Sequence, residues 1–99
     1  MCFAVEIFTG RKRHTAHIDL CENEEDPLQG IAIITHEDCP QRSMSFTPET
    51  QDETLKKLAR TLGQELLFKQ YAHMTQEEIF SGVYPEIEFA FRRIEIRFS

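Results

Sequence analysis

The chain has 99 residues, of which 40% are hydrophobic and 28% charged, and its formal net charge is −6. This length and apolar content predict one globular domain over residues 1–99 with a small core. The negative charge argues against nucleic acid as the main partner, because phosphate binding needs a cationic surface. It favours association with a basic protein partner.

The chain shows no sign of export or of membrane insertion. No segment approaches the roughly 20 apolar residues of a membrane helix, and residues 1–9 lack the cationic start and cleavage site of a signal peptide. Three cysteines (Cys2, Cys21 and Cys39) are an odd number without paired spacing, so free thiols are expected. The four glycines form no nucleotide-binding pattern. We therefore expect a soluble cytoplasmic protein without a cofactor and without membrane contact.

The first half of the chain predicts β-strands. Apolar and polar residues alternate over the first two segments, and short polar or glycine-containing turns separate the predicted strands. The continuous run Ile31-Ala32-Ile33-Ile34 favours a central strand that is covered on both faces. The predicted strands are residues 2–9, 14–21 and 31–36, with a short fourth at 43–46.

A long helix is predicted to follow, from a capping box at Thr50 and Glu53 to about Ala72. One stripe of this helix is apolar, and it consists of Leu55, Leu58, Ala59, Leu62 and Leu66. A second apolar face opens near its end. The side chains there either belong to the interior or form an exposed patch that marks an interface, and they are Leu67, Phe68 and Tyr71.

The last quarter predicts a short helix and a long strand. Thr75 and Glu78 form a second capping box, and the helix should stop at Gly82. Residues 86–98 alternate like a strand, with a change of phase at Arg92-Arg93 that indicates a β-bulge. The order β-β-β-(β)-α-α-β predicts an α+β fold, in which one long and one short helix pack on one face of an antiparallel sheet of four to five strands.

Acidic residues are concentrated in two places. Four carboxylates lie within residues 22–26, and two more follow the next predicted strand. Such groups form either a solvated loop or a docking surface for a basic partner, whose approach the local field would accelerate. The candidate partner-binding residues are Glu22, Glu24, Glu25, Asp26, Glu37 and Asp38.

Histidine and cysteine residues permit a metal or thiol site. His14 and His17, and His36 and Cys39, are each separated by two residues, as in many zinc sites. Residues three apart on a strand point to opposite faces, however, so surface histidines are the expected outcome and no metal is predicted. A small metal-dependent or thiol enzyme that uses His17, His36, Cys21 and Cys39 is the alternative function.

The start Met1-Cys2 resembles that of class II amidotransferases. The resemblance implies that Cys2, once exposed by removal of Met1, attacks the substrate with its own amine as base. It covers two residues, and 99 residues are too few for the second sheet of those enzymes. The other interpretation is a small apolar residue at the head of a strand.

Two basic groups suggest a third function. Arg11-Lys12-Arg13 and Arg92-Arg93 could meet and bind RNA or phosphate, although the net charge opposes this. The leading hypothesis is a non-catalytic protein-binding module: a small acidic inhibitor, or an immunity-type or adaptor protein. In size and charge it is similar to inhibitors carried by phages and mobile elements. A homodimer is compatible with the sequence.

Overall fold

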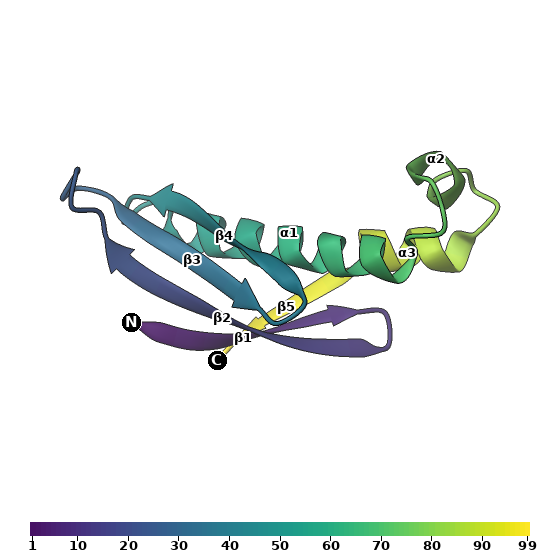
Figure 1. Ribbon diagram of the computed structural model, residues 1–99, viewed down its shortest axis with the longest axis horizontal. Helices are drawn as coiled ribbons and strands as arrows, with labels where there is room; N and C mark the ends of the chain where they lie inside the picture. Colours follow the sequence, from purple (N-terminus) through teal and green to yellow (C-terminus); the bar gives the residue numbers. More distant parts are fainter.

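Five strands form one antiparallel sheet in the computed structural model, which describes residues 1–99 (Figure 1). The order β4-β3-β2-β1-β5 and the helices packed against the sheet confirm the predicted α+β class. The molecule is elongated, measuring 49 × 23 × 22 Å. The strands are β1 (Cys2–Thr9), β2 (Lys12–Glu22), β3 (Gly30–His36), β4 (Cys39–Phe46) and β5 (Ile94–Phe98).

Helix α1 (Gln51–Gln70) runs along one face of this sheet. Alternate strand residues such as Ile7, Ile18 and Ile34 point toward it and are fully or almost fully buried. The leucine stripe of α1 packs against them in a cluster of 11 buried residues. The opposite face carries no helix, and Ile31 and Ile33 on it are only half-buried. The predicted coverage of β3 on both faces is therefore wrong.

Gly63 lets α1 lie close to the sheet. A Cβ atom at this position would lie 2.9 Å from Cγ2 of Ile94 and 3.0 Å from Cγ2 of Ile7. Both neighbours are β-branched, so these methyl groups cannot turn away freely. The hydrogen of glycine is the largest substituent that fits between the helix and strands β1 and β5.

The start of α1 matches the prediction in position but not in its capping contact. Thr50 is the residue before the helix, yet its hydroxyl makes no capping hydrogen bond to the first turn. It accepts instead from the backbone N–H of Thr47, at 2.9 Å. The helix ends at Gln70, short of the predicted Ala72.

A second, smaller core lies at the far end of α1, where α2 (Gln76–Ile79) and α3 (Pro85–Arg92) extend the molecule (Figure 1). Its buried residues are Leu67, Ile79, Ala90 and Phe91. The predicted capping box of Thr75 and Glu78 is present in full. The second apolar face of α1, with Leu67, Phe68 and Tyr71, packs against this small core.

Helix α3 replaces most of the long strand predicted over residues 86–98. Pro85 occupies its first turn, and Arg92 forms an ion pair with Glu88 at 3.0 Å, one helical turn away. Ala90 and Phe91 lie on one helical face and both enter the small core. The change of phase at Arg92-Arg93 therefore marks the passage from helix to strand, and the expected β-bulge does not exist.

The substitution Gly63→Ala should lower the free energy of unfolding by about 1 kcal/mol. Overpacking against Ile7 and Ile94 costs about 1–3 kcal/mol, which outweighs the roughly 1 kcal/mol that alanine gains over glycine in a helix. Urea denaturation measures the change. Gln64→Ala, on the exposed side of the same turn, is the matched control and should shift stability by less than about 0.5 kcal/mol. A more stable Gly63→Ala protein would contradict the close packing of α1.

Candidate functional site

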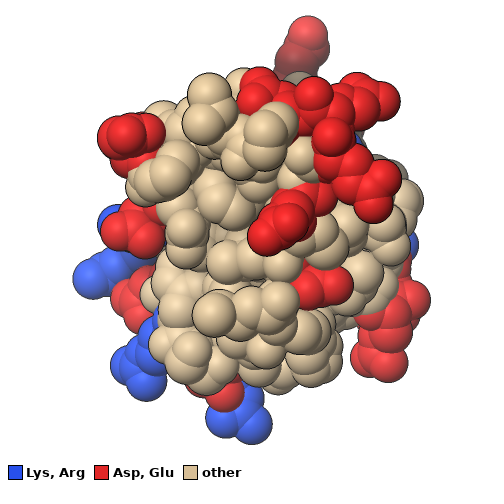
Figure 2. Space-filling view, turned by 90° about the vertical axis from the view of Figure 1, so that its left-hand side faces the viewer, with Lys and Arg blue, Asp and Glu red and all other residues tan.

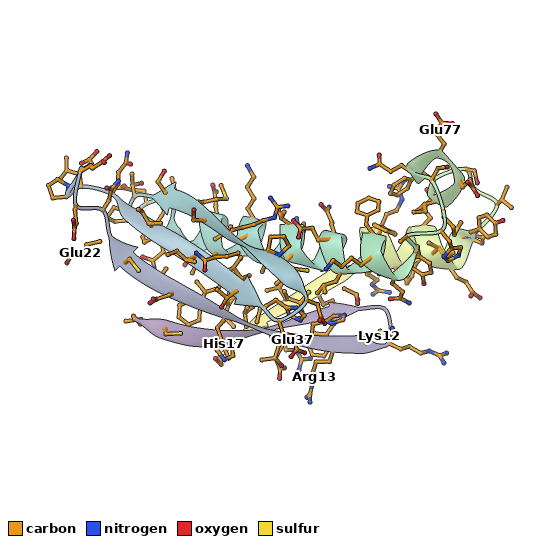
Figure 3. All side chains as sticks on the ribbon, in the orientation of Figure 1. Lys12, Arg13, His17, Glu22, Glu37 and Glu77 are labelled. Carbon is orange, nitrogen blue, oxygen red and sulfur yellow. The ribbon has the colours of Figure 1, made fainter.

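Acidic side chains gather at one end of the molecule. The loop between β2 and β3 lies there and contains three of the four predicted carboxylates, with Glu22 at the end of β2 (Figure 3). Gly30 pairs with Phe46, so the end of β4 and the start of α1 lie beside this loop. The start of α1 adds Glu49, Asp52 and Glu53. We call these seven residues the acidic end: Glu22, Glu24, Glu25, Asp26, Glu49, Asp52 and Glu53.

The loop of the acidic end holds its shape with its own polar groups. Asn23 Oδ1 accepts the N–H of Glu25, and Asp26 Oδ1 accepts the N–H of Leu28, both at 3.0 Å. Such side-chain contacts stabilise turns. Asp26 is half-buried, whereas Glu22, Glu24 and Glu25 are exposed. Asp26 therefore shapes the loop, and the three glutamates are its free charges.

No lysine or arginine neutralises the acidic end. The four ion pairs of the molecule involve Asp19, Glu6, Glu65 and Glu88, none of which belongs to it. Figure 2 views the molecule from this side and shows a dense group of carboxylates over its upper part, with Lys and Arg at the lower margin. The surface is therefore strongly negative over a continuous area.

Glu37 and Asp38 do not join the acidic end. They form the turn between β3 and β4, at the other end of β3, about 20 Å away at 3.3 Å per residue. The N–H of Asp38 donates to His36 Nδ1, and its carbonyl oxygen accepts from Lys69 Nζ of α1. This turn is thus fastened to the helix. The predicted set of six carboxylates divides into two separate places.

The histidines do not converge on a metal site. His14 lies on the face toward α1 and shares a hydrogen bond of 3.0 Å with Thr9, whereas His17 points away from α1 (Figure 3). The ring of His36 packs beside that of His14, with 6.0 Å between ring centres. No group of three His, Cys, Asp or Glu side chains is arranged to hold a metal ion.

The four residues of the candidate thiol site do not converge, although His36 and Cys39 stand opposite each other across the β3–β4 turn. Cys21 pairs with Ile31 on the open face, and Cys39 packs against the core on the other. Burial raises the pKa of Cys39 above its ordinary value, which favours the unreactive thiol. His17 stands opposite Thr35, so His36 is on the other face from it.

Cys2 lies on the open face opposite Asp19. The amino group of Met1 is 3.6 Å from Asp19 Oδ1 and donates to the carbonyl oxygen of Leu20. The chain forms a single sheet, whereas the amidotransferase resemblance implies two. Cys2 is thus an exposed free thiol on the open face of a single sheet.

The β1–β2 turn and the end of α3 lie near each other, since Gly10 and Arg93 line one pocket. A groove of about 860 Å³ between the β1–β2 turn and α3 is lined by Arg11 and Lys12 on one side and by Glu86 on the other. The remaining cationic groups contact acidic or aromatic side chains. These contacts are Arg13–Glu6 (3.8 Å), Arg92–Glu88 (3.0 Å) and Arg93 over Phe89 (5.3 Å).

Apolar side chains are exposed on α3 and in the loop that precedes it. Ile79 of α2 is fully buried in the small core, but Val83 is 70% exposed and Phe89 56% exposed. Of the predicted interface residues, Leu67 is buried, and Phe68 and Tyr71 pack beside Phe91. Phe89 was missed because its alternation with Ile87 and Phe91 indicated a strand.

The fold and its surfaces define the class to which the chain belongs: an α+β domain with a five-stranded antiparallel sheet that is open on one face. The sequence matches no protein-family model, and neither a curated protein nor a solved structure is significantly similar to it. None of the helices has the length and apolar composition needed to cross a membrane.

Stability should fall as the pH drops below about 6.5, because of His14. Burial, followed by the charges of His36 and Lys12, lowers the pKa of His14 below its ordinary value of 6.5. Between the two pKa values the unfolded chain binds more protons than the native one, so acid favours unfolding there. Denaturation of His14→Gln across this pH range should show a weaker dependence. His17→Gln, on the exposed face of β2, is the control and should keep the wild-type slope.

Proposed function

We propose that the protein is a non-catalytic binding domain whose acidic end docks on a basic protein partner. The observation that carries the proposal is the gathering of seven carboxylates at one end without a single ion-pair partner. Within a folded chain, carboxylates grouped in this way repel one another, which costs stability. A cationic partner would relieve that repulsion.

The helix and the loop contribute to the same field. Asp52 and Glu53 lie in the first turn of α1, where the helix dipole favours negative charge. Glu22, Glu24 and Glu25 extend this field outward from the neighbouring loop. Opposite charges on a partner would be steered toward this surface, and the association would weaken as salt increases.

The charge of the partner suggests its class. A protein surface that is basic enough to match the acidic end is typical of sites that bind phosphates or nucleic acid. By occupying such a site, the domain would act as an inhibitor, in the manner of small acidic proteins of phages and mobile elements. An immunity-type or adaptor role uses the same contact.

Reversal of the three exposed loop charges tests the proposal. The wild-type chain and a Glu22→Lys/Glu24→Lys/Glu25→Lys variant are used as bait in lysate of the source cell, and captured proteins are quantified by mass spectrometry. The amount of the same basic protein captured by the variant should be lower by a factor of roughly ten or more. Close charge pairs across interfaces contribute about 1.5 kcal/mol or more each.

A control variant with the same change in net charge is Glu37→Lys/Asp38→Lys/Glu77→Lys, away from the acidic end. It should capture the partner as the wild type does. Equal loss in both variants would show that overall charge, and not the acidic end, drives the binding. Unchanged capture by the loop variant would remove this surface from the proposal.

A further inference from the structure

Strand β5 leaves an unpaired edge on the sheet. Its inner side pairs with β1, and no strand lies beyond it. The N–H of Ser99 donates to the carbonyl oxygen of Ala4 on β1, at 3.2 Å. Because backbone groups of successive strand residues point to alternate sides, those of Ile94, Ile96 and Phe98 point outward. Three N–H and three C=O groups are thus available to another strand.

The side chains of β5 are arranged for pairing with a copy of itself. In an antiparallel pair with its two-fold axis at Ile96, Glu95 of each copy stands opposite Arg97 of the other. Ile94 of each copy then stands opposite Phe98 of the other. All six outward backbone groups of each copy find partners in this arrangement. Opposite charges facing each other across strands are stabilising.

Other registers lack this match. An axis at Glu95 or at Arg97 brings like charges face to face, which is destabilising. A slip by one residue places the core-facing side of one strand beside the open face of the other. Of the axes at Glu95, Ile96 and Arg97, the one at Ile96 alone satisfies charge, backbone and face together.

The opposite edge of the sheet is less suited to such a contact. Strand β4 contains Pro40, which has no N–H group to donate. Proline is a common means of protecting a sheet edge from pairing. Strand β5 contains no proline, and its last residue, Phe98, remains 39% exposed.

The chain exposes more surface than a typical folded monomer of its mass, and a second copy would cover part of it. Its accessible area is 6912 Å², whereas a folded monomer of this mass has about 5,800 Å². Beside the end of β5 lies a groove of about 470 Å³, whose apolar side is formed by Met1, Phe3, Leu55 and Phe98 and whose rim carries Asp52 and Lys56. Ile94 of a second copy would stand next to Phe98, at the margin of this groove.

We propose that two copies of the chain form a dimer by antiparallel pairing of β5 about Ile96. The product is a continuous ten-stranded sheet with both α1 helices on the same face. The interface is the same segment of both copies, as a two-fold symmetric dimer requires. The pairing does not use the carboxylates of the acidic end, although Asp52 of that group lines the groove beside Phe98.

Charge exchange at two positions tests the pairing. Sedimentation of the wild type over a range of concentrations should show a reversible dimer. Glu95→Arg and Arg97→Glu, each alone, create like-charged pairs and should raise the dimer dissociation constant roughly tenfold or more. An equimolar mixture of the two single variants restores both opposite-charge pairs, and so does the double variant Glu95→Arg/Arg97→Glu. Both should dimerise as the wild type does.

Hydrogen exchange of backbone amides gives a readout without mutation. The N–H of Ile96 should become protected as protein concentration rises, whereas that of Arg97, already bonded within the sheet, should stay protected throughout. A wild type that remains monomeric at every concentration would overturn the proposal. Dimers that tolerate both single reversals, or a mixture that fails to associate, would overturn it as well.

Discussion

The packing of α1 against one face of the sheet organises the whole molecule. The helix packs a stripe of leucines against the sheet, and Gly63 brings it so near to β1 and β5 that a methyl group would meet Ile7 and Ile94. This contact forms the larger of the two buried clusters, with 11 residues against four. The remaining parts of the fold are the small core formed with α2 and α3 and the face of the sheet that carries no helix.

The length of α1 also determines where the charges lie. A helix of 20 residues spans about 30 Å, so its two ends reach opposite ends of the elongated molecule. Its start carries Asp52 and Glu53 and lies near the β2–β3 loop, because the end of β4 pairs with the start of β3. At its other end, Leu67 is covered by α2 and α3. Charge and apolar surface are thereby separated along one axis.

The sequence predicted elements that local patterns determine and missed those that tertiary contacts determine. Alternation was sufficient for β1 and β2, a continuous apolar run for β3, and a capping box for α2. Residues 86–92 satisfied both a strand and a helix pattern, because Ile87, Phe89 and Phe91 alternate while Ala90 and Phe91 share a helical face. The small core selects the helix, and no local signal except Pro85 indicated it.

The same distinction applies to the candidate site. Four neighbouring carboxylates were visible in the sequence because they lie within residues 22–26. Their association with Glu49, Asp52 and Glu53 depends on the register that pairs Gly30 with Phe46, which alternation alone leaves open. The separation of Glu37 and Asp38 from this group follows from the length of β3.

The two proposed contacts have a geometric consequence when they are combined. Strand β5 runs in the same direction as β2, which ends at the acidic end. Antiparallel pairing of two β5 strands therefore places the two acidic ends at opposite extremes of the dimer, facing apart. One partner molecule cannot contact both ends unless its basic surface is as long as the dimer itself. The dimer would instead hold two basic partners independently, or gain avidity on a partner with repeated basic sites.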